Sequence, residues 1–117
     1  MNIYDTANRL AAEIRQSDEC RELQRLKDVA YEDETNRRLL TEYKRLQMQL
    51  QMSVVGAAGK LPDEEMQRFQ QLATLLYMNR DVQAYLLAEM QMQKTLSDVF
   101  KILTDAAGIT LDIPGNL

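Results

Sequence analysis

The sequence contains no histidine, and Cys20 is the only cysteine among its 117 residues. Without histidine, Ser-His-Asp and Cys-His catalysis, most zinc sites and the usual pH switch are excluded. A single cysteine cannot form a disulfide within the chain. Cys20 lies on an apolar stripe with helical spacing, so a small buried thiol explains it better than a reactive one.

Proline and glycine are also scarce, with 2 and 4 copies, so a turn-rich β fold is not expected. Hydrophobic residues make up 45% and charged residues 27%, which argues against disorder. No apolar run approaches the length of a membrane span, and the first residues do not have the layout of a signal peptide. We therefore expect a cytoplasmic, all-α protein. Its net charge of −4 provides no basic field for nucleic acid.

Apolar spacing and capping residues predict about five helices in a single helical domain, residues 1–117. The expected helices cover about residues 3–16, 18–30, 33–58, 62–78 and 80–107. Their expected N-terminal caps are Asn2 or Asp5, Ser17 or Asp18, Asp33, and Asn79 or Asp81. Gly108 is expected to end the last helix, leaving residues 108–117 as an extended tail beyond the bundle of residues 3–107.

The longest helix, residues 80–107, has apolar residues at alternating steps of four and three along one seam. These residues are Val82, Leu86, Leu96, Phe100, Leu103 and Ala107, and Glu89 and Gln93 occupy the two remaining seam positions. Such spacing is typical of a helix packed lengthwise against another helix, and residues 33–58 form the natural partner. We expect two long antiparallel helices with shorter helices packed on them, in a dimeric bundle.

The stretch from Leu46 to Met52 alternates strictly between apolar and polar residues, which is also the pattern of a strand. A helix is favoured because the stretch contains no β-branched or aromatic residue and the heptad spacing runs through it. On a helix, Leu46 occupies one face while Met48, Met52 and Val55 occupy a second, roughly opposite face. A helix that is apolar on two sides is usually covered on both.

Four of the 7 methionines, Met48, Met52, Met90 and Met92, lie in the middle of the two long helices. They could fill gaps in the bundle core, or they could form a surface that accepts a partner helix. A homodimer would satisfy both explanations, because its interface would then be the core. The candidate interface residues are Met48, Met52, Val55, Met90 and Met92.

No pattern indicates a catalytic, cofactor or metal site. The stretch from Gly56 to Lys60 lacks the spacing of a P-loop, and the acidic clusters at residues 32–34 and 63–65 are explained by helix dipoles. Four basic residues could contact RNA, but nearby acids favour a solvated helix face. These residues are Arg37, Arg38, Lys44 and Arg45. We therefore expect a protein that is not an enzyme and uses no cofactor.

The order of helices, together with particular residues within it, resembles the YlbF/YmcA/YheA family of small helical bacterial proteins. The residues that carry the resemblance are Ile14, Ser17, Leu23, Asp33, Leu39, Leu40, Tyr43, Gly59, Glu64, Glu65, Asn79, Val82, Tyr85, Leu86, Ala88 and Glu89. The likeness extends from about Ile3 to Ala107, and the chain length and short tail are most similar to the YheA branch.

The resemblance implies a helical bundle, often dimeric, in the bacterial cytoplasm. It also implies a non-enzymatic role, because YlbF and YmcA are partner proteins in a complex that influences RNase Y. The iron–sulfur binding associated with that complex relies on cysteines, and Cys20 alone does not supply them. No cluster is therefore expected here.

The expected function is that of a cytoplasmic regulatory or adaptor protein that forms a homodimer and binds another protein. One alternative is a prefoldin-like holdase that grips unfolded clients with its methionine-rich surface. Another is an accessory protein of an RNA-processing complex that contacts RNA through its basic pairs.

Overall fold

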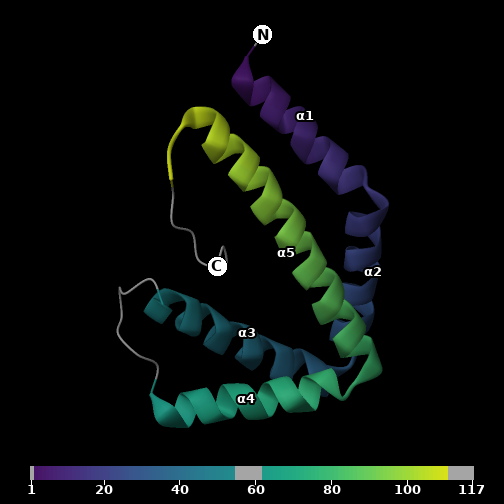
Figure 1. Cartoon of the computed structure of the whole chain (residues 1–117). Helices are drawn as coiled ribbons and strands as arrows, with labels where there is room; N and C mark the ends of the chain where they lie inside the picture. Colours follow the sequence, from purple (N-terminus) through teal and green to yellow (C-terminus); the bar gives the residue numbers. More distant parts are fainter. Residues whose placement is uncertain (1, 55–61, 111–117) are drawn as a thin grey trace.

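The computed structural model describes residues 2–54 and 62–110, and it contains five helices (Figure 1). They are α1 (Ile3–Gln16), α2 (Asp18–Glu32), α3 (Glu34–Val54), α4 (Asp63–Tyr77) and α5 (Arg80–Ala107). Within the two described ranges there is no strand, so the predicted all-α class is confirmed and residues 46–52 are helical. The expected end of the third helix at residues 55–58 and most of the expected tail lie outside the described residues.

The helix ends follow the capping residues of the sequence. Asn2, Ser17, Asp33 and Asn79 each accept a backbone N–H from the first turn of the next helix, at 2.8–3.2 Å. These bonds satisfy donors that have no partner within the helix. Gly108 ends α5 with a φ of 73°, a left-handed conformation that glycine adopts without strain.

The helices form two arms that meet at a corner (Figure 1). In one arm α5 packs on α2, and in the other α3 packs on α4. The predicted lengthwise pairing of α3 with α5 is therefore wrong. The apolar face of α3 is covered by α4 instead, for example where Tyr43 stacks on Phe69 with ring centroids 5.0 Å apart. The long helices meet at the corner, where Lys44 of α3 pairs with Glu89 of α5.

The core lies at this corner. Its buried residues are Ala30, Leu40, Tyr43, Leu46, Leu72, Leu76, Val82, Tyr85 and Leu86. Tyr31 of α2 meets Tyr85 of α5 edge to face, with ring centroids 5.8 Å apart, and this contact joins the two helices at the base of their arm. All helices except α1 contribute to the core, so the corner holds the arms together.

The molecule is flat and open, with extents of 49 × 35 × 16 Å. Its radius of gyration is 16.7 Å, whereas a compact domain of this length would have one of about 13 Å. Far from the corner little covers the helices, and α1 contains no buried residue. None of the described helices is long and apolar enough to cross a membrane.

Candidate protein-interaction site

The second apolar face of α3 is exposed in the single chain. Met48 and Met52 lie one turn apart with 59% and 42% of their surface exposed, whereas Leu46 on the opposite side is buried. Both methionines therefore face away from the core, as the alternation in the sequence predicted. Val55, the third residue predicted for this face, lies outside the described residues.

The methionines of α5 do not share one surface. Met90 is 55% exposed. Met92 is half-buried beside α2 and lines a hollow of about 550 Å³ together with Asp18, Glu19 and Glu22. Residues two positions apart point about 160° apart around a helix. Of the four described methionines in the candidate interface, the structure therefore brings together only Met48 and Met52 as one helix face.

Large apolar side chains are also exposed on α1 and on the distal half of α5, where the sequence had predicted covered stripes. The most exposed of them are Ile3, Tyr4, Leu96, Ile102 and Leu103. Apolar periodicity shows that a helix face needs cover, but it does not distinguish cover by the same chain from cover by another molecule. For this reason sequence reasoning missed these exposed faces.

Where α3 and α5 meet, Lys44, Tyr85 and Glu89 form a polar cluster. Lys44 pairs with Glu89, whose other carboxylate oxygen accepts a hydrogen bond from the Tyr85 hydroxyl at 2.8 Å. The Lys44 ammonium also lies 5.2 Å from the centroid of the Tyr85 ring, within the range of a cation–π contact. Burial, followed by the hydrogen bond to Glu89, raises the pKa of the Tyr85 hydroxyl. The three groups satisfy one another and join the two arms.

The sequence interpretation missed this cluster, because it placed Lys44 on a solvated basic face. The available signal was Glu89, a carboxylate in a row of apolar seam positions. A charged residue at such a position is stable only with a partner, and the partner is a lysine from another helix.

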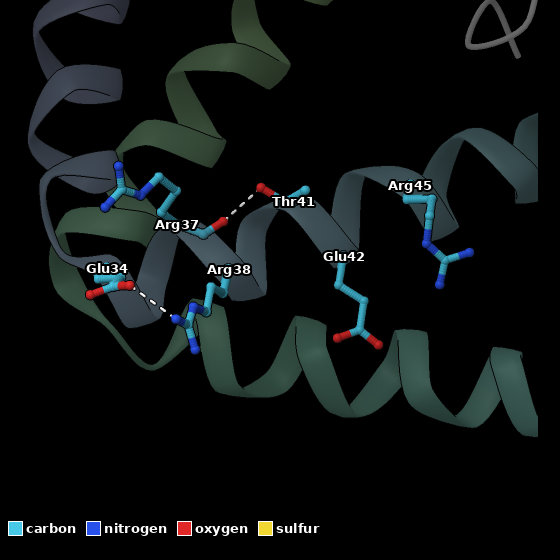
Figure 2. Close-up of a pocket in the computed structure, with 6 residues that line it drawn as sticks. All are labelled: Glu34, Arg37, Arg38, Thr41, Glu42 and Arg45. Carbon is cyan, nitrogen blue, oxygen red and sulfur yellow. Dashed lines mark hydrogen bonds and ion pairs between the residues drawn. The ribbon is translucent and has the colours of Figure 1, made fainter.

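The remaining basic residues of α3 lie among acidic residues of the same helix. Figure 2 shows a hollow of about 410 Å³ lined by Glu34, Arg37, Arg38, Thr41, Glu42 and Arg45, all from α3. Their side chains diverge, with Arg37 pointing away from Arg38 and Glu42. Arg38 pairs with Glu34 at 3.0 Å, and Glu42 binds Arg68 of α4 through two bonds of 2.9 and 3.0 Å. Arg37, Arg38 and Arg45 thus line one hollow beside acidic residues, whereas Lys44, the fourth cation suggested for RNA, is directed to the corner.

Residues 2–54 and 62–110 offer no arrangement typical of a reaction centre. In these ranges no group of three or more acidic or cysteine side chains is placed to hold a metal ion. No buried side-chain nitrogen or oxygen among them lacks a hydrogen-bond partner. Cys20 is half-buried near the start of α2. The distinctive surface features are thus exposed apolar helix faces.

Comparison with known proteins identifies the family. The sequence profile described as "Control of competence regulator ComK, YlbF/YmcA" matches residues 3–106, nearly the whole chain. This protein belongs to the YlbF/YmcA family. The resemblance inferred from helix caps and core positions is therefore confirmed, whereas the assignment to the YheA branch stays a prediction.

Two relatives of this chain are described as UPF0342 proteins. The one from Halothermothrix orenii is 33% identical over 103 residues, which cover 88% of this chain and 86% of the relative. The one from Caldicellulosiruptor saccharolyticus is 27% identical over 116 residues, or 99% and 96% of the two chains. A solved structure, a protein of unknown function (DUF964) from Bacillus stearothermophilus, superposes with a TM-score of 0.73 at 25% identity, covering 91% of this chain and 92% of the other.

Proposed function

We propose that this member of the YlbF/YmcA family is a cytoplasmic, non-enzymatic regulatory adaptor that acts by binding proteins, including a second copy of itself. The observation that carries the proposal is the exposure of large apolar side chains on several helices, which include α1, α3 and α5. Covering such surface releases about 25 cal/mol per Å², and extended exposed patches mark interaction sites. The family description, which names control of a competence regulator, supports a regulatory role.

The exposed face around Met48 and Met52 is a candidate contact for the protein partner or for the second copy, and Val55 extends it in sequence. Methionine is flexible and polarisable, so a methionine face can adapt to the shape of a partner helix. Met90 forms a separate exposed position on α5, and Met92 lies at the acidic hollow beside α2. Two aspartates replacing Met48 and Met52 would place charges in any apolar contact made there.

A complementation experiment tests the regulatory part. The chain is expressed in a competence-forming bacterium that lacks its own YlbF/YmcA protein, and ComK-dependent transcription is measured. We expect the wild type to restore transcription and the Met48→Asp/Met52→Asp variant to fail while keeping its helical circular dichroism. The Gln67→Asp/Gln71→Asp variant provides the matched control, because it adds the same charges one turn apart on an exposed face of α4. No restoration by the wild type at equal expression would contradict a regulatory role.

The self-association part is tested by the mass of the protein in solution. Light scattering over a wide range of concentrations is expected to give the mass of a dimer, twice 13.5 kDa. A wild type that remains monomeric at the highest concentration would contradict self-association and leave the exposed faces for other proteins.

The exposure of Met48, Met52 and Met90 also favours a second candidate, the prefoldin-like holdase. A holdase would suppress aggregation of an unfolded client, and the Met48→Asp/Met52→Asp variant would lose that activity. If neither the wild type nor the variant suppresses aggregation of the client, this candidate is excluded. An RNA-binding accessory role has less support, because Lys44 is paired with Glu89.

A further inference from the structure

The apolar seams of α1 and of the distal half of α5 have the same spacing. The α1 seam consists of Ile3, Ala7, Leu10 and Ile14, and the distal α5 seam of Leu96, Phe100, Leu103 and Ala107. Each seam advances by four, three and four residues and is therefore about 16 Å long. Two helices with seams of equal length and spacing can pack lengthwise against each other.

Most residues of both seams are exposed in the single chain, whereas Leu10, Ile14 and Phe100 are half-buried. Ile3 is 83% exposed on α1, and Leu103 is 56% exposed on α5. The charged residues of distal α5 do not interrupt its seam, because they pair with one another at 3.1 Å on the opposite side of the helix. These pairs are Lys94–Asp98 and Lys101–Asp105. The α5 seam is thus a continuous apolar stripe without unpaired charge.

A one-residue joint at Ser17 sets the direction of α1. The Ser17 hydroxyl donates a hydrogen bond to the Ile14 carbonyl at 2.6 Å and accepts one from the Cys20 N–H at 3.2 Å. The same side chain therefore caps the end of α1 and the start of α2. With this joint, α1 leaves the distal α5 seam of its own chain exposed.

We propose that a second copy of this chain covers the seams, with α1 of each copy packed on the distal α5 seam of the other. The two helices run in opposite directions within one chain (Figure 1). In antiparallel alignment Ala7 lies opposite Leu103 and Ile3 opposite Ala107, so a small side chain faces a large one. Because the contact is reciprocal, each copy contributes two seams, on α1 and on distal α5, toward the roughly 800 Å² that each partner buries in a stable complex.

This inference rests on the proposed self-association and assigns it to one surface. It is tested by disulfide crosslinking in a Cys20→Ser background, which has no other thiol. One chain carries Ala7→Cys, and a second chain with a mass tag carries Leu103→Cys. Both positions are exposed, so neither change disturbs the corner core. After mixing and mild oxidation, we expect a crosslinked dimer that contains one tagged and one untagged chain. Ala7→Cys mixed with Lys94→Cys is the matched control, and it should not crosslink, because Lys94 lies on the opposite side of α5.

Other outcomes separate this assignment from the proposed function. If the doubly substituted Ala7→Cys/Leu103→Cys chain instead forms its disulfide within a single monomer, α1 closes on its own α5 and the exchange is refuted. A dimer by light scattering without the mixed crosslink would refute the seam assignment but keep self-association. A monomer at all concentrations would refute both.

Two variants with added negative charge give an independent check on the same assignment. Leu103→Asp should weaken dimer formation at least tenfold, whereas Met48→Asp/Met52→Asp should leave the dimer intact. The opposite pattern would place the self-contact on α3 and overturn the proposal.

Discussion

The corner of the molecule and its distal ends carry the same kind of apolar helix stripe in different surroundings. At the corner, Leu40 and Leu72 are fully buried, and in each arm one aromatic pair joins the two helices. On α1 and distal α5, stripes with equivalent spacing face outward. The comparison shows that spacing specifies which side of a helix requires cover, whereas the arrangement of helices decides whether the chain itself supplies it.

The largest expected effect tests this contrast directly. Leu40→Ala should lower the free energy of unfolding by about 2–5 kcal/mol, because it opens a cavity in the fully buried corner. Leu103→Ala is the matched control at an exposed position and should cost less than about 1 kcal/mol in dilute protein. Urea unfolding followed by circular dichroism measures both. Equal losses at low protein concentration would show that the distal seam is covered within one chain.

A smaller effect is expected at the polar cluster of the corner. Lys44→Ala should lower the free energy of unfolding by about 1–2 kcal/mol, because the half-buried Glu89 loses its charged partner. A double-mutant cycle with Glu89→Ala isolates the interaction between the two side chains. The exposed pair Lys101–Asp105 provides the distal counterpart, and its cycle should give a smaller coupling. Equal coupling energies for the two pairs would show that an ion pair at the corner stabilises the fold no more than an exposed pair on distal α5.

The pH dependence of stability should also report on the corner. The pKa of the Tyr85 hydroxyl is raised above its ordinary value of 10.0, chiefly by burial and then by the hydrogen bond to Glu89. The folded state therefore favours the protonated hydroxyl, and its stabilising contribution is complete below pH 10 and declines as the pH rises further. We expect the urea midpoint to fall between pH 9 and pH 11, and to fall less in Tyr85→Phe. If the urea midpoint falls equally with pH in the wild type and in Tyr85→Phe, the pH dependence does not come from the Tyr85 hydroxyl.

The smallest effect is expected for the exposed link between α3 and α4. The Arg68 guanidinium lowers the pKa of the Glu42 carboxyl below its ordinary value of 4.5 by hydrogen bonding. Its contribution to stability is therefore present at neutral pH and lost as the pH falls below that value. Arg68→Ala should shift the urea midpoint slightly at pH 7, and less in high salt, because exposed pairs are screened. A shift as large as that of Lys44→Ala would mean that this pair stabilises the fold as much as the polar cluster at the corner does.

Much of the fold was predictable because its signals are local. A cap such as Ser17 or Asn79 acts within one turn of the chain, and the left-handed end at Gly108 depends on a single residue. The pairing of the long helices was not predictable in this way. The heptad pattern of α5 would fit α2 or α3 equally well, and the structure places α5 on α2.

The candidate site was predictable only in part. The alternation from Leu46 to Met52 correctly predicted a second apolar face, and the structure shows Met48 and Met52 exposed on it. The grouping of Met90 with Met92 ignored that neighbours two positions apart point to different sides of a helix. The role of Lys44 depended on a residue 45 positions away, which local patterns do not reveal.

The sequence by itself determined the helical class, the positions of the helix ends, the lack of histidine chemistry and membership in the YlbF/YmcA family. These properties follow from side-chain type and short-range spacing. Only the tertiary structure decided that the apolar stripes divide into a covered corner and open arms. That division depends on how helices distant in sequence are oriented, and the one-residue joint at Ser17 directs α1 away from the core that the other four helices share.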